Sequence, residues 1–458
     1  MSSQQPNVIV FFTDQQRWDT VGLHGNPLDL TPNFDRLASL GTFLRNSITC
    51  QPLCGPARAC MQTGQYATSV GCFRNGIPLP RNVPTLAKAF GGAGYDTGYI
   101  GKWHLGPMRD EGSVRGSRTW VQKDWRGGYG DWLAANALEH SSNAYDCRVY
   151  NNRNAEVKLP GYRVDALTDA AIRYIAQPRE NPFYLFLSFL EPHHQNHLDD
   201  YPPPNGYRER YTGRWVPPDL AALGGSAHKH LGGYYGMVKR LDEALGRLFD
   251  ALISLDLDEN TILLFTTDHG CHFKTRNGEY KRSCHESSVR LPTFIAGPGF
   301  RGGGSRDEIV SLVDFPPTLL DAAGVAVPDA MQGRSLMPRL RDPSVPWQDD
   351  CFIQISESGI GRAVRTERWK YAVDAGVPGG VETASSDIYR ESHLFDLWHD
   401  PYELENLIQS GSHAGVSEEM RERLLARMSQ TGEAIPTIEP ADRKQASRRS
   451  SEAVSPNR

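Results

Sequence analysis

The chain has 458 residues, of which 22% are charged and 39% hydrophobic, and its formal net charge is −5 at pH 7. This balance excludes a protein that acts mainly as a nucleic-acid binder, because such domains carry a clear excess of Lys and Arg. No stretch approaches the roughly 20 apolar residues of a membrane helix, so we expect no membrane partner. The first residues, MSSQQPNVIVFF, lack the basic and apolar segments of a signal peptide, and we expect a cytoplasmic protein.

Five apolar runs of strand length are spread along the first 300 residues. Their residues are apolar or aromatic without a break, which is typical of parallel strands buried on both faces. The runs cover residues 7–14, 97–103, 183–190, 261–268 and 291–297. They predict the central strands of one sheet.

Helical patterns lie between these runs. The first has Thr31 at a candidate N-cap, Pro32 at the first helical position and Gly41 at the stop, as the preferences for helix ends predict. Two more cover residues 164–177 and 230–255. Strands that alternate with helices predict a doubly wound α/β domain over residues 5–344.

The pattern changes near residue 345. Residues 350–400 contain short strands and turns, and a helical segment, SEEMRERLLARMSQ, follows at 417–430. We expect a smaller α+β domain over residues 345–435, with an antiparallel sheet and a helix. The polar and nearly apolar-free segment 436–458 is predicted to be disordered.

Polar side chains follow four of the predicted strands. Asp14 and Gln15 come after the first, His104 after the second and His193 after the third, and Asp268 with His269 after the fourth. Ligands in open α/β sheets bind beyond the carboxyl ends of the strands. Two carboxylates, an amide oxygen and an imidazole at one edge therefore indicate a site for a hard divalent ion. Taken alone, Asp14 also fits the cap of a turn.

Three cysteines, Cys50, Cys54 and Cys60, lie within eleven residues. Their spacing is unlike that of a zinc knuckle, and the Cys-x-x-Cys pair of a redox site is absent. We expect Cys50 and Cys60 to be buried packing residues, and the eight cysteines of the chain to be reduced thiols. Cys54 differs, because it precedes a Gly-Pro pair that opens a helix, where free N–H groups favour an anion. Arg58 adds a second anion partner.

The segment Cys54-Gly55-Pro56-Ala57-Arg58, followed by MQTGQ, resembles the Cys-x-Pro-x-Arg signature of the type I sulfatases, in the alkaline-phosphatase-like superfamily. Other segments resemble the same family in the same order over residues 7–410. They are FFTDQQRWD, GKWHLG (101–106), TTDHG (266–270), KRSCHESSVRLP (281–292) and LFDLWHDPYELENL (394–407). The resemblance implies a mixed, largely parallel sheet sandwiched by helices, with a smaller C-terminal subdomain.

The resemblance also implies a modified residue and a metal. Cys54 is oxidised by a maturation enzyme to Cα-formylglycine, whose hydrate is the nucleophile. The metal ligands carried over are Asp14, Gln15, Cys54, Asp268 and His269. Oxygen ligands suggest one Ca²⁺ per chain. His269 departs from the Asn or Gln of many members, and its imidazole leaves Mn²⁺ open, with Mg²⁺ as a further possibility.

The catalytic residues implied by the resemblance are Cys54, Arg58, Lys102, His104, His193 and Lys281. Lys102 contacts the sulfate and the aldehyde hydrate, and His104 helps to expel sulfate. His193 protonates the leaving alcohol, and Lys281 binds the outer sulfate oxygens. His194 and His197 are weaker candidates for substrate selection. Without the resemblance, the default expectation for each lysine is an exposed side chain with no catalytic role.

We therefore expect a sulfatase that hydrolyses sulfate monoesters. The loops at 193–215 and 271–281 are rich in His, Arg, Asn and Tyr, which favours a sugar sulfate over an apolar aryl ester. One alternative is a phosphonate monoester or phosphodiester hydrolase with the same site, which Gln15 and His269 allow. A further alternative is a non-catalytic, metal-dependent anion-binding protein with an unmodified cysteine.

Overall fold

The computed structural model describes residues 5–108, 119–376 and 382–442. Its centre is an eleven-stranded sheet with the order β11-β2-β10-β8-β1-β7-β3-β4-β5-β6, in which β9 also pairs with β2. Five neighbouring strands run parallel: β8 (Thr261–Thr267), β1 (Asn7–Thr13), β7 (Phe183–Ser188), β3 (Asp96–Lys102) and β4 (Asp131–Ala135). The mixed, largely parallel sheet is confirmed.

Strands at both sides of this group complete the sheet. β2 (Thr42–Ile48) is parallel to β11 (Gly304–Ser311), and β5 (Cys147–Tyr150) is antiparallel to β4 and to β6 (Glu156–Leu159). The run predicted at 291–297 is divided between β9 (Arg290–Leu291) and β10 (Phe294–Ala296). β10 is antiparallel to β8 and β2, because the chain leaves the carboxyl end of β8 and, after the segment 268–293, returns along β8 in the opposite direction.

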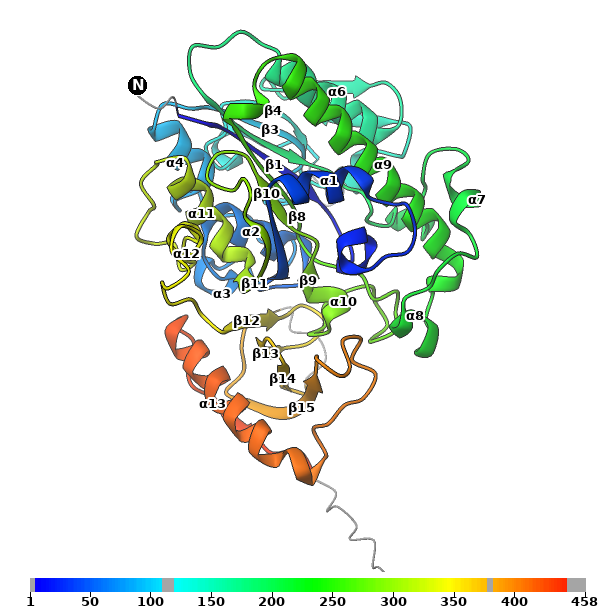
Figure 1. The fold of residues 1–458 in the computed structure, drawn as a ribbon, viewed down its shortest axis with the longest axis vertical. Helices are drawn as coiled ribbons and strands as arrows, with labels where there is room; N and C mark the ends of the chain where they lie inside the picture. Colours follow the sequence, from blue (N-terminus) through cyan, green and yellow to red (C-terminus); the bar gives the residue numbers. More distant parts are fainter. Residues whose placement is uncertain (1–4, 109–118, 377–381, 443–458) are drawn as a thin grey trace, which may run out of the picture.

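Helices cover both faces of the sheet (Figure 1). On one face lie α1 (Pro32–Leu40), α6 (Arg163–Ile175) and α9 (Ala227–Ser254), whose apolar residues share a core cluster with Ile9 and Phe11 of β1. On the other face lie α2 (Cys54–Thr63), α4 (Leu86–Gly92) and α11 (Phe315–Ala322), which pack with Val8, Val10 and Phe12. The alternation along β1 follows from the two-residue period of a strand, and it explains why the whole run is apolar.

The start of α1 is stabilised by a distant residue. Thr31 occupies the N-cap position but makes no side-chain cap, and its hydroxyl accepts instead from the Gly22 N–H at 3.1 Å. The Asp242 carboxylate of α9 accepts from the backbone N–H groups of Asn33 and Phe34 at 3.1 and 2.8 Å. Tertiary structure therefore supplies the cap that the sequence pattern assigned to Thr31.

A second, five-stranded sheet follows in the C-terminal part of the chain. β12 (Asp350–Ile355), β13 (Gly361–Thr366), β14 (Trp369–Asp374) and β15 (Ile388–Asp396) are antiparallel, and α13 (Ala414–Gln430) packs on them. β16 (Thr437–Glu439) pairs with β15, so the ordered subdomain extends past residue 435 and the prediction of disorder from 436 is wrong at its start. Residues 443–458 of the predicted tail lie outside the described residues.

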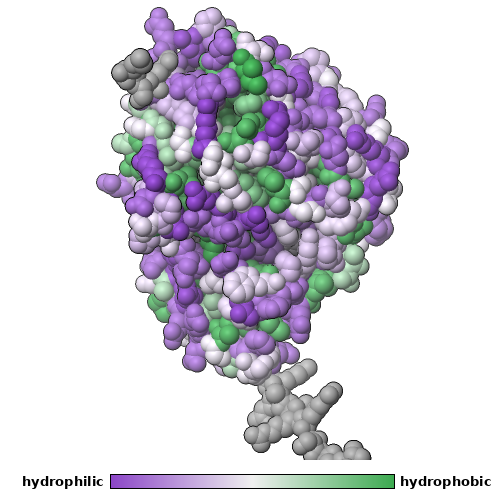
Figure 2. All heavy atoms as spheres, viewed as in Figure 1, coloured by the Kyte–Doolittle hydropathy of each residue, from purple (hydrophilic) through white to green (hydrophobic). Residues whose placement is uncertain are grey.

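Shorter helices occupy the loops: α3 (Ala67–Val70), α5 (Leu138–Ser141), α7 (Tyr207–Tyr211), α8 (Pro218–Ala222), α10 (Glu286–Val289) and α12 (Met337–Arg341). Across the described ranges, no helix combines the length and apolarity needed to cross a bilayer. On the face shown in Figure 2, hydrophilic residues predominate and hydrophobic ones form small separate groups. All eight cysteines are buried and free of disulfides, and the predicted burial of Cys50 and Cys60 is confirmed.

Candidate active site

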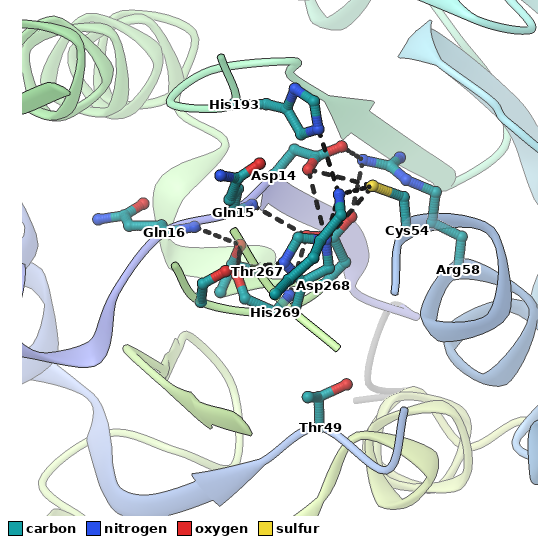
Figure 3. A network of polar contacts seen from close by, with 12 residues as sticks. Asp14, Gln15, Gln16, Thr49, Cys54, Arg58, His193, Thr267, Asp268 and His269 are labelled. Atoms are coloured by element: carbon teal, nitrogen blue, oxygen red, sulfur yellow. Dashed lines mark hydrogen bonds and ion pairs between the residues drawn. The ribbon is translucent and has the colours of Figure 1, made fainter. Parts of the chain in front are cut away.

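Four adjacent parallel strands bring the predicted site residues to one edge of the sheet. Asp14 follows β1, Asp268 follows β8, Lys102 ends β3, and His193 lies five residues beyond the end of β7. These strands are neighbours in the order β8-β1-β7-β3, so residues up to 254 positions apart in sequence meet. Figure 3 shows the side chains of Asp14, Cys54, Arg58 and His269 directed toward one another.

Cys54 is the first residue of α2 and is 2% exposed. Its Sγ lies 2.8 Å from Lys281 Nζ, 3.3 Å from His269 Nε2 and 3.5 Å from Asp14 Oδ1. Burial alone would raise the pKa of this thiol, but Lys102, Lys281 and His269 hold the pKa well below its usual range. Position 54 is therefore a buried point that favours a negatively charged atom.

Arg58, one helical turn after Cys54, binds the carboxylates of the site. Its Nη2 lies 2.9 Å from Asp14 Oδ2 and 3.3 Å from Asp268 Oδ2. Its Nη1 donates to Ser188 Oγ at 2.7 Å and to the Lys102 carbonyl at 3.0 Å. Both terminal nitrogens of the guanidinium are thus engaged within the protein. We expected Arg58 to bind the substrate anion directly, whereas its contacts make it a clamp on the two carboxylates.

Lys102 is fully buried between two carboxylates. Its Nζ lies 2.8 Å from Asp14 Oδ2 and 3.2 Å from Glu139 Oε1. Burial by itself would lower the pKa of this ammonium, but Asp14, Cys54 and Glu139 raise it above the usual value. Lys102 therefore remains a cation in the site. β3 ends at Lys102 and His104 has a φ of 61°, so the two residues do not lie on the same face of one strand. His104 nevertheless lies near Cys54, because both residues line the same cavity, which is described below.

Two buried oxygens that accept no hydrogen bond indicate where a cation fits. The Gln15 side chain donates through Nε2 to Tyr201 Oη and Cys271 Sγ, each at 3.2 Å, which holds the amide in place. Among the described residues, Gln15 Oε1 is buried without a hydrogen-bond partner, and the buried Asp268 Oδ2 has no hydrogen bond and only the ion pair with Arg58 Nη2 at 3.3 Å. Burial and the neighbouring Asp14 raise the pKa of Asp268 to about 6. A divalent cation would satisfy both oxygens and stabilise the ionised carboxylate.

His269 completes this set. Its Nδ1–H donates to the Gly270 carbonyl at 2.9 Å, which leaves the Nε2 lone pair facing Asp268 Oδ1 and Asp14 Oδ1 at 3.6 and 3.7 Å. A metal-ligating histidine has this arrangement, with its other nitrogen fixed on an acceptor. The ligand atoms of Asp14, Cys54, Asp268 and His269 all lie within 4.8 Å of one another. The residues therefore fit a divalent metal ion.

Two further predicted residues, Lys281 and His193, also lie in the site. Lys281 Nζ lies 3.2 Å from His193 Nε2 and 3.2 Å from His269 Nε2. His193 Nδ1 donates to the His194 carbonyl at 2.7 Å, so its Nε2 is the nitrogen turned into the site. Burial and the charge of Lys281 lower the pKa of His193. His194 stacks on His193 with 4.5 Å between the ring centroids, whereas His197 is exposed and is not among the lining residues.

Glu139, in α5, is a site residue that the sequence did not reveal. Besides its contact with Lys102, it has a buried Oε2 without a hydrogen-bond partner in the described part of the chain, and it lines the cavity. Burial would raise the pKa of its carboxyl, but Lys102, His104 and His193 lower it to about 2. The available signal was that Glu139 follows the end of β4 by four residues, as other site residues follow their strands. However, β4 is only five residues long and mixes polar with apolar residues, so the sequence did not identify it as a strand.

A cavity of about 520 Å³ opens above Cys54. This volume lies within the range of about 300–1,000 Å³ that is typical of ligand sites. His104, Glu139, His193 and Lys281 surround its inner end, and polar residues form its rim: Asn75, Asn196, Asp199, Lys274, Glu279, Tyr280 and Arg282.

Two protein families match the sequence of this chain. The family described as Sulfatase matches residues 6–325, and the one described as N-sulphoglucosamine sulphohydrolase, C-terminal, matches residues 278–430. An ulvan-active sulfatase of Formosa agariphila is 28% identical over 94% of this chain and 82% of its own. An N-acetylglucosamine-6-O-sulfatase of Bacteroides thetaiotaomicron is 24% identical over 92% of this chain and 86% of its own.

Solved structures share the fold. A Bacteroides fragilis protein described as the sulfatase yidJ superposes with a TM-score of 0.82 at 24% identity, over 95% of this chain and 98% of that one. The phosphonate monoester hydrolase of Agrobacterium radiobacter superposes less closely, with a TM-score of 0.69 at 25% identity, over 93% and 96% of the two chains.

Proposed function

The chain belongs to the sulfatase family and is a sulfuric ester hydrolase, and we propose that its substrate is the sulfate ester of a sugar. The observation that carries the proposal is the buried cluster in which Cys54 meets Asp14 and Asp268 beside the cations of Lys102 and Lys281. The cavity above it is lined by polar side chains, which suit a hydroxyl-bearing substrate. The similarity to an N-acetylglucosamine-6-O-sulfatase supports the same class.

The modification of Cys54 is part of the proposal. A maturation enzyme converts Cys54 to formylglycine, whose hydrate supplies one hydroxyl to attack sulfur and a second that permits release of sulfate. Support comes from the position of Sγ, which contacts a cation and an imidazole at 2.8 and 3.3 Å. An oxygen at this position would lie among the same groups. The non-catalytic alternative is not retained, because the family is one of hydrolases.

We also propose that Asp14, Gln15, Asp268, His269 and position 54 hold one divalent ion, which would supply positive charge beside the sulfate oxygens. Ca²⁺ is the first candidate because most of these ligand atoms are oxygens. The imidazole of His269 leaves Mn²⁺ and Mg²⁺ as the other candidates. The support is the pair of buried oxygens of Gln15 and Asp268 that accept no hydrogen bond.

The chain's own residues bind and orient the substrate. Lys102 and Lys281 offer ammonium groups to sulfate oxygens, and Arg58 fixes the carboxylates that the site needs in place. Preorganised charges of this kind stabilise the charge that develops in the transition state. His193 presents Nε2 to the leaving alcohol, because Nδ1 is fixed on the His194 carbonyl. A bound anionic substrate favours the protonated imidazole that this donation requires. His104 serves as the base for sulfate release.

The test uses protein produced together with a formylglycine-generating enzyme. Mass spectrometry of the tryptic peptide that carries residue 54 should show the aldehyde, and the matured protein should hydrolyse sulfated monosaccharides. Cys54→Ala should abolish turnover. Full activity with an unmodified thiol would refute the covalent role of residue 54. A kcat/KM that is higher for an aryl phosphonate ester than for any sulfate ester would favour the phosphonate hydrolase, and activity on nitrophenyl or choline sulfate alone would refute the sugar substrate.

A further inference from the structure

A second cavity, of about 460 Å³, adjoins the catalytic cavity where the segment 276–285 meets the small sheet. Gly278, Glu279 and Arg282 line both cavities, so a single stretch of chain forms the wall between them. The remaining lining comes from the end of β12, the turn that leads into β13, the start of β13, and β14 and β15, and it includes Gly359 and His393. The second cavity therefore lies beside the place where a substrate's sulfate is bound.

The dividing wall is rigidly built. The Arg282 guanidinium contacts Glu279 and lies 2.5 Å from Glu357 Oε1, while Glu357 Oε2 accepts from the Asn75 N–H at 2.7 Å. Arg282 and Glu357 have φ values of 63° and 77°, in a region that costs a non-glycine residue about 1–3 kcal/mol. These contacts hold both residues in this conformation. They also balance the Arg282 charge with two carboxylates.

The wall leaves free space at one point. A Cβ added at Gly278 would meet no atom within 4 Å, so open space lies where a side chain of this residue would project. Because Gly278, Glu279 and Arg282 line both cavities, groups bound in either cavity lie against the same short stretch of chain.

The second cavity carries polar groups that the catalytic site does not use. His285 is 6% exposed, and across the described ranges its Nδ1 has no hydrogen-bond partner. Burial, together with the charges of Arg276, His393 and Lys370, holds the pKa of His285 well below its usual range, so the ring is neutral. His393 packs edge-on against it with 5.2 Å between the centroids. Buried polar atoms normally have partners, and a neutral imidazole pairs with a hydroxyl.

We propose that the second cavity binds neutral, hydroxyl-bearing sugar units that adjoin the sulfated unit, so that the substrate is an oligosaccharide or polysaccharide. This inference rests on the proposed sulfatase function. Neutral imidazoles, the hydroxyls of Ser283 and Ser392 and the paired Arg282 and Glu279 offer both donors and acceptors, as the hydroxyl groups of a sugar require. Because the wall arginine is neutralised, hydroxyl groups fit it better than a second sulfate does.

Gly359 allows a selective test, because a Cβ at this position also meets no atom within 4 Å and the residue lines only the second cavity. Gly359→Trp should fill that cavity and leave the site around Cys54 unchanged. The matched control is Gly415→Trp, at an exposed glycine of α13 with equally free space. His393→Phe keeps a ring against His285 and removes the two nitrogens, and it serves as a second variant if Gly359→Trp does not fold.

The measurement is kcat/KM of matured enzyme on a sulfated tetrasaccharide, the corresponding sulfated monosaccharide and nitrophenyl sulfate. For wild type and Gly415→Trp, kcat/KM should be about ten-fold or more higher on the tetrasaccharide than on the monosaccharide. A ten-fold difference corresponds to roughly 1.4 kcal/mol of added binding free energy. Gly359→Trp and His393→Phe should lose that preference and keep their activity on the two small substrates. Calorimetric titration with the unsulfated tetrasaccharide should show the same loss of binding.

Two results would overturn the inference: equal kcat/KM of wild type for the tetrasaccharide and the monosaccharide, or an equal loss on all three substrates in both variants. Failure of the proposed function is distinguishable from either, because matured wild type would then hydrolyse none of the three sulfate esters.

Discussion

Replacement of Lys281 by Met should separate the activity of this enzyme from its stability. The side chain is 6% exposed, and its Nζ contacts Cys54 Sγ, His193 Nε2 and His269 Nε2 at 2.8 to 3.2 Å. None of these contacts is a carboxylate, and no ion pair involves Lys281 in the described part of the chain. Its charge is therefore directed at the site and contributes little to the fold.

The size of the effect follows from the charge that is removed. An ammonium about 4 Å from a bound sulfate oxygen, in a medium with an effective dielectric constant of about 20, contributes about 4 kcal/mol. If this attraction strengthens as charge develops in the transition state, kcat/KM should fall by about 10² to 10³-fold. The melting temperature should change little, because no carboxylate loses an ion-pair partner when the Lys281 ammonium is removed.

Lys370→Met is the matched control. Lys370 is also a buried lysine, but its Nζ lies 2.6 Å from Glu286 Oε1 and 2.7 Å from Glu403 Oε1. Breaking this buried pair should cost about 3–5 kcal/mol of unfolding free energy. The assays are kcat/KM on a sulfate ester and thermal unfolding of both variants. A Lys281→Met protein that retains more than about a tenth of wild-type kcat/KM, or that melts as low as Lys370→Met, would refute the reasoning.

Three other variants test the surroundings of the cluster. Glu139→Gln should lower kcat by about 10-fold without raising KM, because Lys102 loses one of its two carboxylates while the site becomes less negative; an unchanged kcat in steady-state assays would contradict this role. Gln15→Ala should weaken binding of Ca²⁺ or Mn²⁺ about 10-fold in calorimetric titration, and equal affinity would remove Gln15 from the ligand set. In metal-free protein, the raised pKa of Asp268, about 6, means that its contribution to stability is present at low pH and lost as pH rises through 6. The melting temperature of metal-free wild type minus that of Asp268→Asn should therefore fall between about pH 4, the ordinary pKa of an unfolded Asp, and pH 6, and a rise would show the opposite sign.

Much of the site could be predicted because its residues are tied to local signals. Asp14 and Asp268 each follow a buried apolar run that is seven residues long in the structure, and such runs end at the ligand-binding edge of a parallel sheet. Cys54 and Arg58 are four residues apart at the start of one helix, so their proximity follows from the helical repeat. The order of these motifs along the chain was sufficient to indicate the family.

Contacts that depend on the order of the strands in the sheet could not be predicted from local sequence patterns. The direction of β10, the engagement of Arg58 by two carboxylates and the place of Glu139 beside Lys102 all depend on how distant segments meet. Asp242 caps α1 from 208 residues away, where a local pattern favoured Thr31. No period or spacing in the sequence records these distances.

The sequence by itself determined the apolar strands, the helix that begins at Cys54 and the set of side chains at the strand ends, because hydrophobic periodicity and helix-end preferences act over a few residues. Only the tertiary structure decided which of those side chains touch, which oxygens are left without partners, and that a second cavity shares the Gly278–Arg282 wall with the first. The physical reason is that burial, charge pairing and cavity shape arise from segments that are far apart in the chain and adjacent only after the sheet has formed.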